Sequence, residues 1–284
     1  MKMAILGFGI MGSIMSESVL RAGYDLVVCN RTIEKTKLFA DKGASVANTP
    51  AQAISMADVS IIVVMGGDAI KEIMLSPDVL AAVKNKTIIC ASSCKVDEMM
   101  SVNTAVIEHG GRFAEITMGS TSANHSVENL YFELGCPAED ETFLVETLSP
   151  MCEEIQRFGE VGYLAKLGCL GSVGNLISLI NIAYCTALAQ RLGIPSEDYE
   201  PTIREMDPIA GYFIDKMSAH DYKDVVTHIE HYLDSARETL TLLEENNLPT
   251  EPLMPMLKLL EAAADEYPKK DGACVVEILL NDKI

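Results

Sequence analysis

The chain has 284 residues, of which 49% are hydrophobic, and a formal net charge of −19 at pH 7. This length is sufficient for two domains of ordinary size, and the hydrophobic content excludes a wholly disordered chain. The strong negative charge argues against nucleic acids and anionic membranes as partners, because both repel an acidic surface. Residues 1–42 depart from this trend, since they hold six basic and four acidic residues. We therefore expect a small anionic ligand near the N-terminal end.

Signals for membrane insertion and secretion are not expected from the sequence. No run of uncharged apolar residues is expected to reach the roughly 18 that a membrane span needs. The opening residues "MKMAILGFG" enter a strand pattern without an apolar leader and cleavage site. The eight cysteines include no CxxC pair, which is typical of reduced thiols. We expect a cytoplasmic protein.

Strands and helices alternate through the first half of the chain. This alternation predicts an α/β fold with a parallel, doubly wound sheet. Strand patterns cover residues 3–8, 25–30, 44–48, 59–65, 86–92, 111–118 and 129–135, and helix patterns cover residues 12–23, 32–43 and 50–57.

From about residue 160 the pattern becomes helical. A long helix is expected to follow residue 162 and to include the apolar residues 176–194, and further helices are expected over residues 222–247 and 255–267. We predict one domain over residues 1–160 and an all-α domain over residues 161–284, joined by that long helix. Gly168, Gly171 and Gly174 recur inside it, although each costs about 1 kcal/mol relative to alanine. We expect them to thin the helix where it passes a cofactor or a packed neighbour.

A glycine motif joins the first strand to the first helix. "GFGIMG" has the GxGxxG spacing of dinucleotide-binding Rossmann domains and lies in the strand–turn–helix context that the motif needs. Gly7 permits the tight turn, Gly9 lets the backbone approach a pyrophosphate, and Gly12 lets the helix pack closely on the strand. A glycine-rich turn without a ligand is the alternative. The predicted cofactor-binding residues here are Gly7, Phe8, Gly9, Ile10, Met11 and Gly12.

The end of the second strand indicates which dinucleotide binds. An acidic residue there would bind a ribose 2′-hydroxyl and repel a 2′-phosphate. The chain has Asn30 instead, followed by Arg31 and Thr32, with Lys35 one turn later. Cationic groups beside an uncharged polar residue favour NADP over NAD, although an arginine exposed on the surface is the alternative.

These motifs resemble the β-hydroxyacid dehydrogenase superfamily, which includes 3-hydroxyisobutyrate dehydrogenases, glyoxylate/succinic semialdehyde reductases and imine reductases. The resemblance rests on "GFGIMG", "NRTIEK", "ASS", "GRFAEITMGS", "FGEVG", "LAQRLGI" and "DGACVVEIL" and covers nearly the whole chain. It implies a Rossmann domain followed by a helical domain, and homodimers with active sites between subunits. It also implies that Ser92 lies near nicotinamide and substrate, and we place Met65 with the cofactor-binding residues.

The catalytic residues are less clear from the resemblance. Family members place a lysine six residues after the glycine that matches Gly162, and here that position is Gly168. Lys166 falls two residues short, although a two-residue gap would restore it. In the family, an asparagine follows the lysine by four residues. Ser172 stands at that place here, and Asn175, one turn beyond, is an alternative polar contact.

Other residues offer a proton donor or a substrate contact. Tyr163 precedes the helix, and Ser120 opens a polar loop with Thr121, Ser122 and Asn124 that could hold an oxyanion. A solvated loop explains the same composition. A helical stripe of Asp224, His228, His231 and Asp234 could hold a general acid or a metal, or be a solvated face; we predict no metal and include Asp234 among the catalytic candidates.

The sequence thus predicts an NADP(H)-dependent oxidoreductase that transfers hydride to a small carbonyl or imine substrate. Imine reductases also lack the lysine, because a protonated iminium accepts hydride without leaving an oxyanion. The alternative is an inactive NADP-binding sensor or interaction protein derived from that family.

Overall fold

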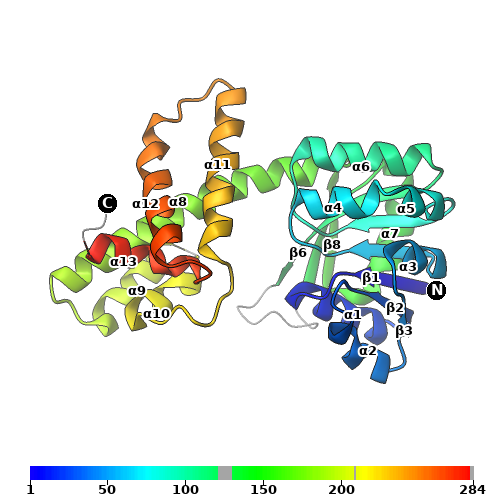
Figure 1. Ribbon diagram of the computed structural model, residues 1–284, viewed down its shortest axis with the longest axis horizontal. Coiled ribbons are helices and arrows are strands. Elements are labelled where there is room, and N and C mark those ends of the chain that lie inside the picture. The colour runs from blue at the N-terminus through cyan, green and yellow to red at the C-terminus, as the bar shows by residue number, and fades with distance from the viewer. Residues whose placement is uncertain (121–129, 208, 282–284) are drawn as a thin grey trace. The chain divides into compact units, whose positions relative to one another are not determined.

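The computed structural model describes residues 1–120, 130–207 and 209–281 (Figure 1). The contacts divide the chain into two compact units, Met1–Gly168 and Cys169–Ile284. The predicted boundary after residue 160 lies before the long helix, and the contact division lies inside it. Each unit is described by itself below.

Eight strands of the described part form one sheet in the first unit, in the order β3-β2-β1-β4-β5-β6-β7-β8. The first six strands pair in parallel, as predicted for a doubly wound fold. The strands are β1 (Lys2–Leu6), β2 (Asp25–Cys29), β3 (Ser45–Val46), β4 (Val59–Ile62), β5 (Thr87–Cys90), β6 (Arg112–Ser120), β7 (Leu130–Gly135) and β8 (Glu154–Gly159).

The far edge of this sheet differs from the prediction. β7 runs antiparallel to β6, so the sheet is mixed, and β8 pairs in parallel with β7. No strand is predicted from the sequence over the residues of β8. Side chains of this edge strand alternate between exposed and half-buried, so it lacks the continuous apolar run by which the central strands were recognised.

Helices cover both faces of the sheet, because successive strand residues point to opposite faces. Met3 and Ile5 pack in one cluster with α1, α2 and α7, whereas Ala4 and Leu6 pack in another with α3, α4, α5 and α6. These helices are α1 (Ile10–Arg21), α2 (Lys37–Asp41), α3 (Pro50–Met56), α4 (Gly67–Met74), α5 (Pro77–Ala82), α6 (Val96–Glu108) and α7 (Glu141–Leu148). The helix predicted over residues 32–43 is instead a 3₁₀ turn, Ile33–Thr36, followed by α2.

Helices joined by loops make up the second unit, and no strand occurs among its described residues. Its core gathers apolar side chains from α8, α9, α10, α11, α12 and α13, and α11 and α12 lie side by side in Figure 1. The helices are α8 (Tyr163–Arg191), which begins in the first unit, α9 (Ser196–Met206), α10 (Ala210–Ala219), α11 (Ile229–Glu245), α12 (Met254–Glu266) and α13 (Val275–Leu280). The long helix after residue 162 is therefore confirmed. The helix predicted over residues 222–247 is confirmed for Ile229–Glu245, whereas its predicted start at residue 222 is wrong.

α8 bears on the expectation that no run of the chain is apolar enough to span a membrane. Among the described residues it is the one helix long and apolar enough by length and composition, with a mean hydropathy of 1.4 over 18 residues. Only 22% of those residues are buried. The core helices of soluble proteins meet the same test, so this is weak evidence for a membrane span, but it shows that α8 presents much apolar surface in a single chain.

Candidate cofactor site

The candidate site lies where the strand order reverses, between β1 and β4. Leu6 pairs with Ile62 at the carboxyl ends of these strands, and the next residue of β4's loop, Val63, donates its N–H to the carbonyl of Leu6 at 2.7 Å. The loops after the two strands therefore leave the sheet side by side. In open parallel sheets, ligands bind at this point, because neighbouring loops diverge there to opposite faces.

The glycine loop has the shape that a dinucleotide needs. Gly7 has φ +106°, and a Cβ there would lie 2.0 Å from the carbonyl oxygen of Val63. A Cβ on Gly12 would lie 2.0 Å from the carbonyl oxygen of Gly7. By contrast, a Cβ on Gly9 would meet no atom within 4 Å. Gly7 and Gly12 are thus required by the fold itself, whereas Gly9 leaves open space outside the chain.

The open space at Gly9 lies at the N-terminus of α1. Gly9 is the N-cap residue, so no side chain caps the first N–H groups, and the first turn holds no acidic residue. Free N–H groups and the helix dipole favour an anion at such an end. The residues present therefore fit the pyrophosphate of a dinucleotide cofactor.

Asn30 holds the glycine loop in place. Its Oδ1 accepts the N–H of Phe8 at 3.0 Å, and its Nδ2 donates to the carbonyl of Thr32 at 2.8 Å. The amide is thus engaged with the backbone on both sides. An aspartate could accept the first bond but could not donate the second. Asn30 therefore sets the loop geometry without adding negative charge.

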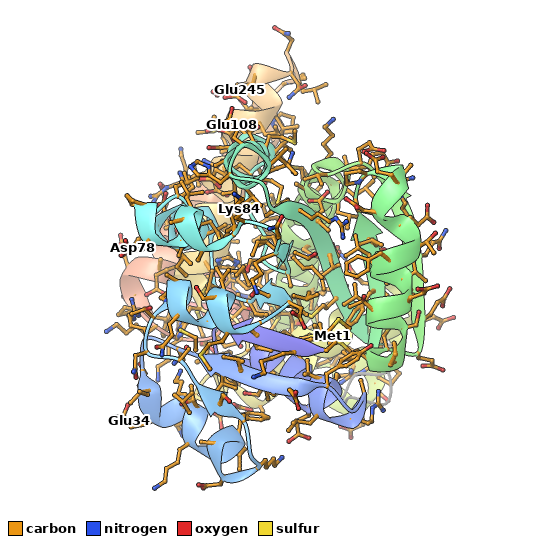
Figure 2. All side chains as sticks on the ribbon, turned by 90° about the vertical axis from the view of Figure 1, so that its right-hand side faces the viewer. Met1, Glu34, Asp78, Lys84, Glu108 and Glu245 are labelled. Carbon is orange, nitrogen blue, oxygen red and sulfur yellow. The ribbon has the colours of Figure 1, made fainter. Side chains whose placement is uncertain are left out.

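The basic residues next to Asn30 are available to a ligand. Arg31, Thr32 and Lys35 are all exposed in and before the 3₁₀ turn. Glu34 in the same turn is also exposed, and Figure 2 shows it at the periphery of the first unit. Arg31 and Lys35 can therefore present two cationic groups beside the end of β2, where the ribose of a dinucleotide lies in such folds.

The loop after β4 completes this edge. Met65 is 79% exposed, and Ile10 at the start of α1 is 65% exposed. Ser92 accepts the N–H of Val64 at 2.8 Å and donates its hydroxyl to the carbonyl of Ile62 at 3.1 Å. Ser92 thus fixes the loop that carries Met65. Gly66 in that loop is not among the predicted site residues, although its φ of +84° and the Gly66–Gly67 pair after a strand mark a turn.

Two catalytic candidates lie in the first unit, at the start of α8. Tyr163 and Lys166 are exposed and three residues apart, so they neighbour each other on the helix surface. The Tyr163 ring lies over Gly159, where a Cβ would approach it to 3.0 Å. The structure thus presents both polar groups on the same turn.

The other candidates are placed elsewhere or not described. Asn175 and Asp234 lie in the second unit, both exposed, and Asp234 forms an ion pair with Arg237 at 3.9 Å. Ser120 ends β6, and its side chain and the residues of the polar loop, Thr121, Ser122 and Asn124, lie outside the described residues.

The predicted stripe of Asp224, His228, His231 and Asp234 does not form on one helix. Asp224 lies in the loop before α11, where its carbonyl accepts a hydrogen bond from Lys216, and His228 is the N-cap of α11. No group of three potential metal-ligating side chains occurs among the residues that the structure describes.

The glycines of α8 leave room for a Cβ atom. A Cβ on Gly168, Gly171 or Gly174 would meet nothing within 4 Å beyond the helix's own backbone. The predicted packing against a neighbour is therefore not found among the described residues of the chain.

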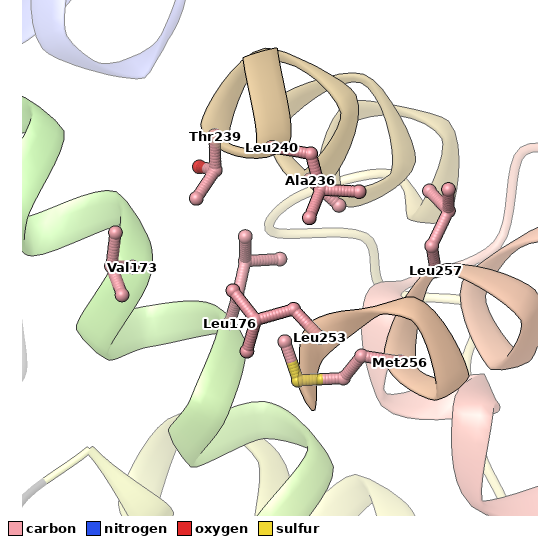
Figure 3. A pocket seen from close by; sticks show the side chains of 8 residues that line it. All are labelled: Val173, Leu176, Ala236, Thr239, Leu240, Leu253, Met256 and Leu257. Carbon is pink, nitrogen blue, oxygen red and sulfur yellow. The ribbon is translucent and has the colours of Figure 1, made fainter. Parts of the chain in front are cut away.

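A small apolar cavity lies among described residues of the helical unit (Figure 3). It lies among α8, α11 and α12, and its interior is about 10 Å³, roughly the room for one water. The lining residues are Val173, Leu176, Ala236, Thr239, Leu240, Leu253, Met256 and Leu257. Because it is so small and almost wholly apolar, it is not a cofactor or substrate site.

Comparison with known proteins agrees with this geometry. Residues 2–159 match the family model described as the NAD binding domain of 6-phosphogluconate dehydrogenase. The chain belongs to this family. The resemblance to the β-hydroxyacid dehydrogenase and imine reductase superfamily is thereby confirmed, and with it a nucleotide-binding domain of the NAD(P) type.

Among curated proteins, the chain is similar to cytokine-like nuclear factor N-PAC of Anopheles gambiae. The two are 26% identical over 259 residues, which cover 88% of this chain and 45% of that protein. The chain thus spans less than half the length of this relative.

Two solved structures show the same fold. A 3-hydroxyisobutyrate dehydrogenase of Mycobacterium tuberculosis is 19% identical, covers 98% of both chains and has a TM-score of 0.81. An imine reductase of Myxococcus stipitatus in complex with NADP⁺ is 20% identical, covers 98% of this chain and 100% of its own, and has a TM-score of 0.64.

Proposed function

We propose that this protein is an NADP(H)-dependent oxidoreductase that transfers hydride between the cofactor and a small carbonyl or imine compound. The observation that carries this proposal is the open space at Gly9, at an uncapped helix N-terminus, between two glycines that the fold requires. The family of the first unit and the fold of the whole chain support it. The preference for NADP rests on Arg31 and Lys35, which can bind a 2′-phosphate, and on the neutral Asn30.

The cofactor-holding residues have separate tasks. The N–H groups at the start of α1 would hold the pyrophosphate, Arg31 and Lys35 the 2′-phosphate, and Ile10 and Met65 would cover apolar parts of the cofactor. NADP(H), when bound, supplies or accepts the hydride. The remaining task of the chain is to bind the substrate and move one proton.

That proton distinguishes the two substrate classes. Reduction of a carbonyl leaves an alkoxide oxygen, which must gain a proton from a donor. Lys166 is our candidate, with Tyr163 beside it as an alternative. A protonated iminium needs no such donor. The glycine at position 168, where the family has lysine, therefore favours the imine class.

The substrate class is tested by NADPH consumption across a panel of aldehydes, keto acids and cyclic imines. We expect turnover of members of this panel, with NADPH preferred to NADH. Turnover of cyclic imines alone would exclude a hydroxyacid dehydrogenase.

A second candidate is a protein that binds NADP without turning it over. The absence of lysine at position 168 favours it, and the similar curated protein is named as a nuclear factor and not as a dehydrogenase. Tight NADPH binding without consumption of NADPH by any panel member would support this alternative.

We also propose that the protein is a cytoplasmic homodimer. α8 contains no acidic residue, although the chain has 41, and Leu170, Ile177, Tyr184 and Leu188 lie exposed along one of its faces. An apolar face of this kind is typical of an interface. All eight cysteines are free, in keeping with a reducing compartment.

A further inference from the structure

Glu115 is a buried carboxylate at the edge of the sheet where the cofactor loops gather. It pairs with Cys90 of β5, the last residue of that strand, and is 2% exposed. Space for its side chain exists because its partner in β7 is Gly135, where a Cβ would approach the Glu115 side chain to 2.7 Å. A buried carboxylate is costly unless it is hydrogen-bonded, so its partners indicate its role.

The partners of Glu115 are backbone N–H groups at the start of α8 and of the residue before it. Its Oε1 accepts from the backbone N–H of Gly162 at 2.7 Å and of Leu164 at 2.9 Å. Burial raises the pKa of Glu115, while hydrogen bonds from Leu164, Gly162 and Ala165 and the charge of Lys166 act in the opposite direction. A carboxylate on β6 thus performs the task of an N-cap for a helix that begins directly after Gly162, which lies 47 residues later in the chain.

The backbone around this contact leaves little freedom. Gly162 has φ +92°, and a Cβ there would lie 3.0 Å from the Sδ of Met100 on α6. Val161 and Ala165 pack against the cluster that contains α6 residues Met99 and Val102. The first turn of α8 is therefore pinned by packing on one side and by one carboxylate at its end.

We propose that Glu115 is the positioning residue for the proton-donor turn: by binding the N–H groups of Gly162 and Leu164, it fixes Tyr163 and Lys166 at the carboxyl edge of the sheet. This inference rests on the proposed oxidoreductase function. Glu115 acts through the backbone of the turn, because the hydrogen bonds of its Oε1 are to backbone N–H groups. Because two of its acceptor contacts use one oxygen, a glutamine at this position can retain them.

Three variants test the proposal. Glu115→Met removes the acceptor and keeps the volume, Glu115→Gln retains an acceptor oxygen, and Thr49→Ala removes an N-cap of α3, where Thr49 accepts the N–H of Gln52, as a matched control. For each we measure backbone hydrogen exchange in residues 161–166, the NADPH dissociation constant, and kcat and KM for a carbonyl substrate found in the panel.

We expect Glu115→Met to speed exchange in residues 161–166 and to lower kcat, each by about tenfold or more, with NADPH affinity within about threefold of wild type. Glu115→Gln should restore kcat to within about fivefold. Loss of NADPH affinity in parallel with kcat, or a kcat in Glu115→Met equal to that of Thr49→Ala, would overturn the proposal.

The exchange measurement separates this inference from the function on which it rests. If the wild-type protein turns over no substrate, the proposed function fails, but faster exchange confined to residues 161–166 in Glu115→Met still shows that Glu115 positions the turn. Unchanged exchange there would refute the positioning role, whatever the activity.

Discussion

At the scale of single residues, the glycine loop separates positions required by the fold from a position left open for a ligand. A Cβ on Gly12 collides with the chain, whereas one on Gly9 meets nothing. Both glycines belong to one motif, so the sequence pattern alone assigns them the same importance. The structure gives them different physical tasks, and these can be measured separately.

Gly9→Ala should leave folding stability nearly unchanged, because Gly9 has φ −86° and ψ −162°, which alanine also adopts. It should weaken NADPH binding about tenfold or more, since a methyl group enters the space for the pyrophosphate. Gly12→Ala is the matched variant and should lower the melting temperature, because its Cβ overlaps the carbonyl of Gly7. Thermal unfolding and NADPH titration of both variants would check this. A Gly9→Ala variant that loses as much thermal stability as Gly12→Ala, or that binds NADPH as tightly as wild type, would contradict it.

Arg31→Ala should weaken NADPH binding by about tenfold and leave NADH binding unchanged, because the guanidinium has a partner only when a 2′-phosphate is present. Lys42→Ala is the control, since Lys42 lies in the same basic segment but pairs with Glu17. Fluorescence titration with both cofactors measures the ratio. An unchanged ratio of NADPH to NADH affinity in Arg31→Ala would refute the assignment of cofactor preference.

Lys166→Ala should lower kcat for a carbonyl substrate by about a hundredfold, the usual effect of removing a general acid. Reduction of a cyclic imine should change by less than about threefold, because the iminium already carries its proton. The comparison needs steady-state kinetics with one substrate of each class. Equal losses for both substrates would show that Lys166 is not the proton donor.

At the scale of elements, the start of α11 shows where local sequence patterns mislead. Residues 222–228 have helical spacing but lie outside the helix. Asp271 accepts the N–H of Val226 at 2.9 Å, and Tyr222 donates its hydroxyl to Glu277 at 2.5 Å. These contacts join residues more than 40 positions apart, so tertiary bonds draw the backbone away from a helix that the pattern favours.

Asp271→Asn should reduce the free energy of unfolding by about 3 kcal/mol, because it breaks a buried ion pair with Lys216 at 2.8 Å. Asp271 is buried and also accepts the N–H of Ala273. Asp234→Asn is the control and should cost less than about 0.5 kcal/mol, since its pair with Arg237 is exposed. Urea denaturation of both variants measures these changes. Similar losses of unfolding free energy in the two variants would contradict the structural role of Asp271.

α8 presents the clearest exposed apolar face. Tyr184→Glu combined with Leu188→Glu should convert a dimer into a monomer, because two carboxylates would be buried without partners. Light scattering coupled to gel filtration should give twice the 30.8 kDa of one chain for the wild type and the mass of one chain for the variant. A monomeric wild type would contradict the proposed homodimer.

At the scale of the whole molecule, the fold class and the glycine loop follow from the sequence, because both depend on local signals. The central strands are recognisable as apolar runs, and Gly7, Gly9 and Gly12 lie within six consecutive residues. The antiparallel β7, the edge strand β8 and the capping of α8 by Glu115 could not be predicted in the same way. Each depends on pairing or contact between distant segments that composition does not reveal.

The catalytic residues follow least from the sequence. Lys166 and Gly168 differ by two positions, and the register of a helix cannot be chosen from spacing alone. The structure places Lys166 on the same exposed turn as Tyr163 and shows that a Cβ on Gly168 would meet no atom within 4 Å beyond the helix's own backbone. The kinetics of Lys166→Ala with a carbonyl and an imine substrate therefore identify the proton donor.

The central claim is direct hydride transfer from NADPH to a substrate. The most direct measurement uses NADPH deuterated at C4, on each face in turn, with the best substrate of the panel. We expect one of the two deuterated forms of NADPH to deliver deuterium to the carbon of the reduced carbonyl or imine. A product without deuterium from either cofactor, or NADPH binding with no product at all, would contradict it.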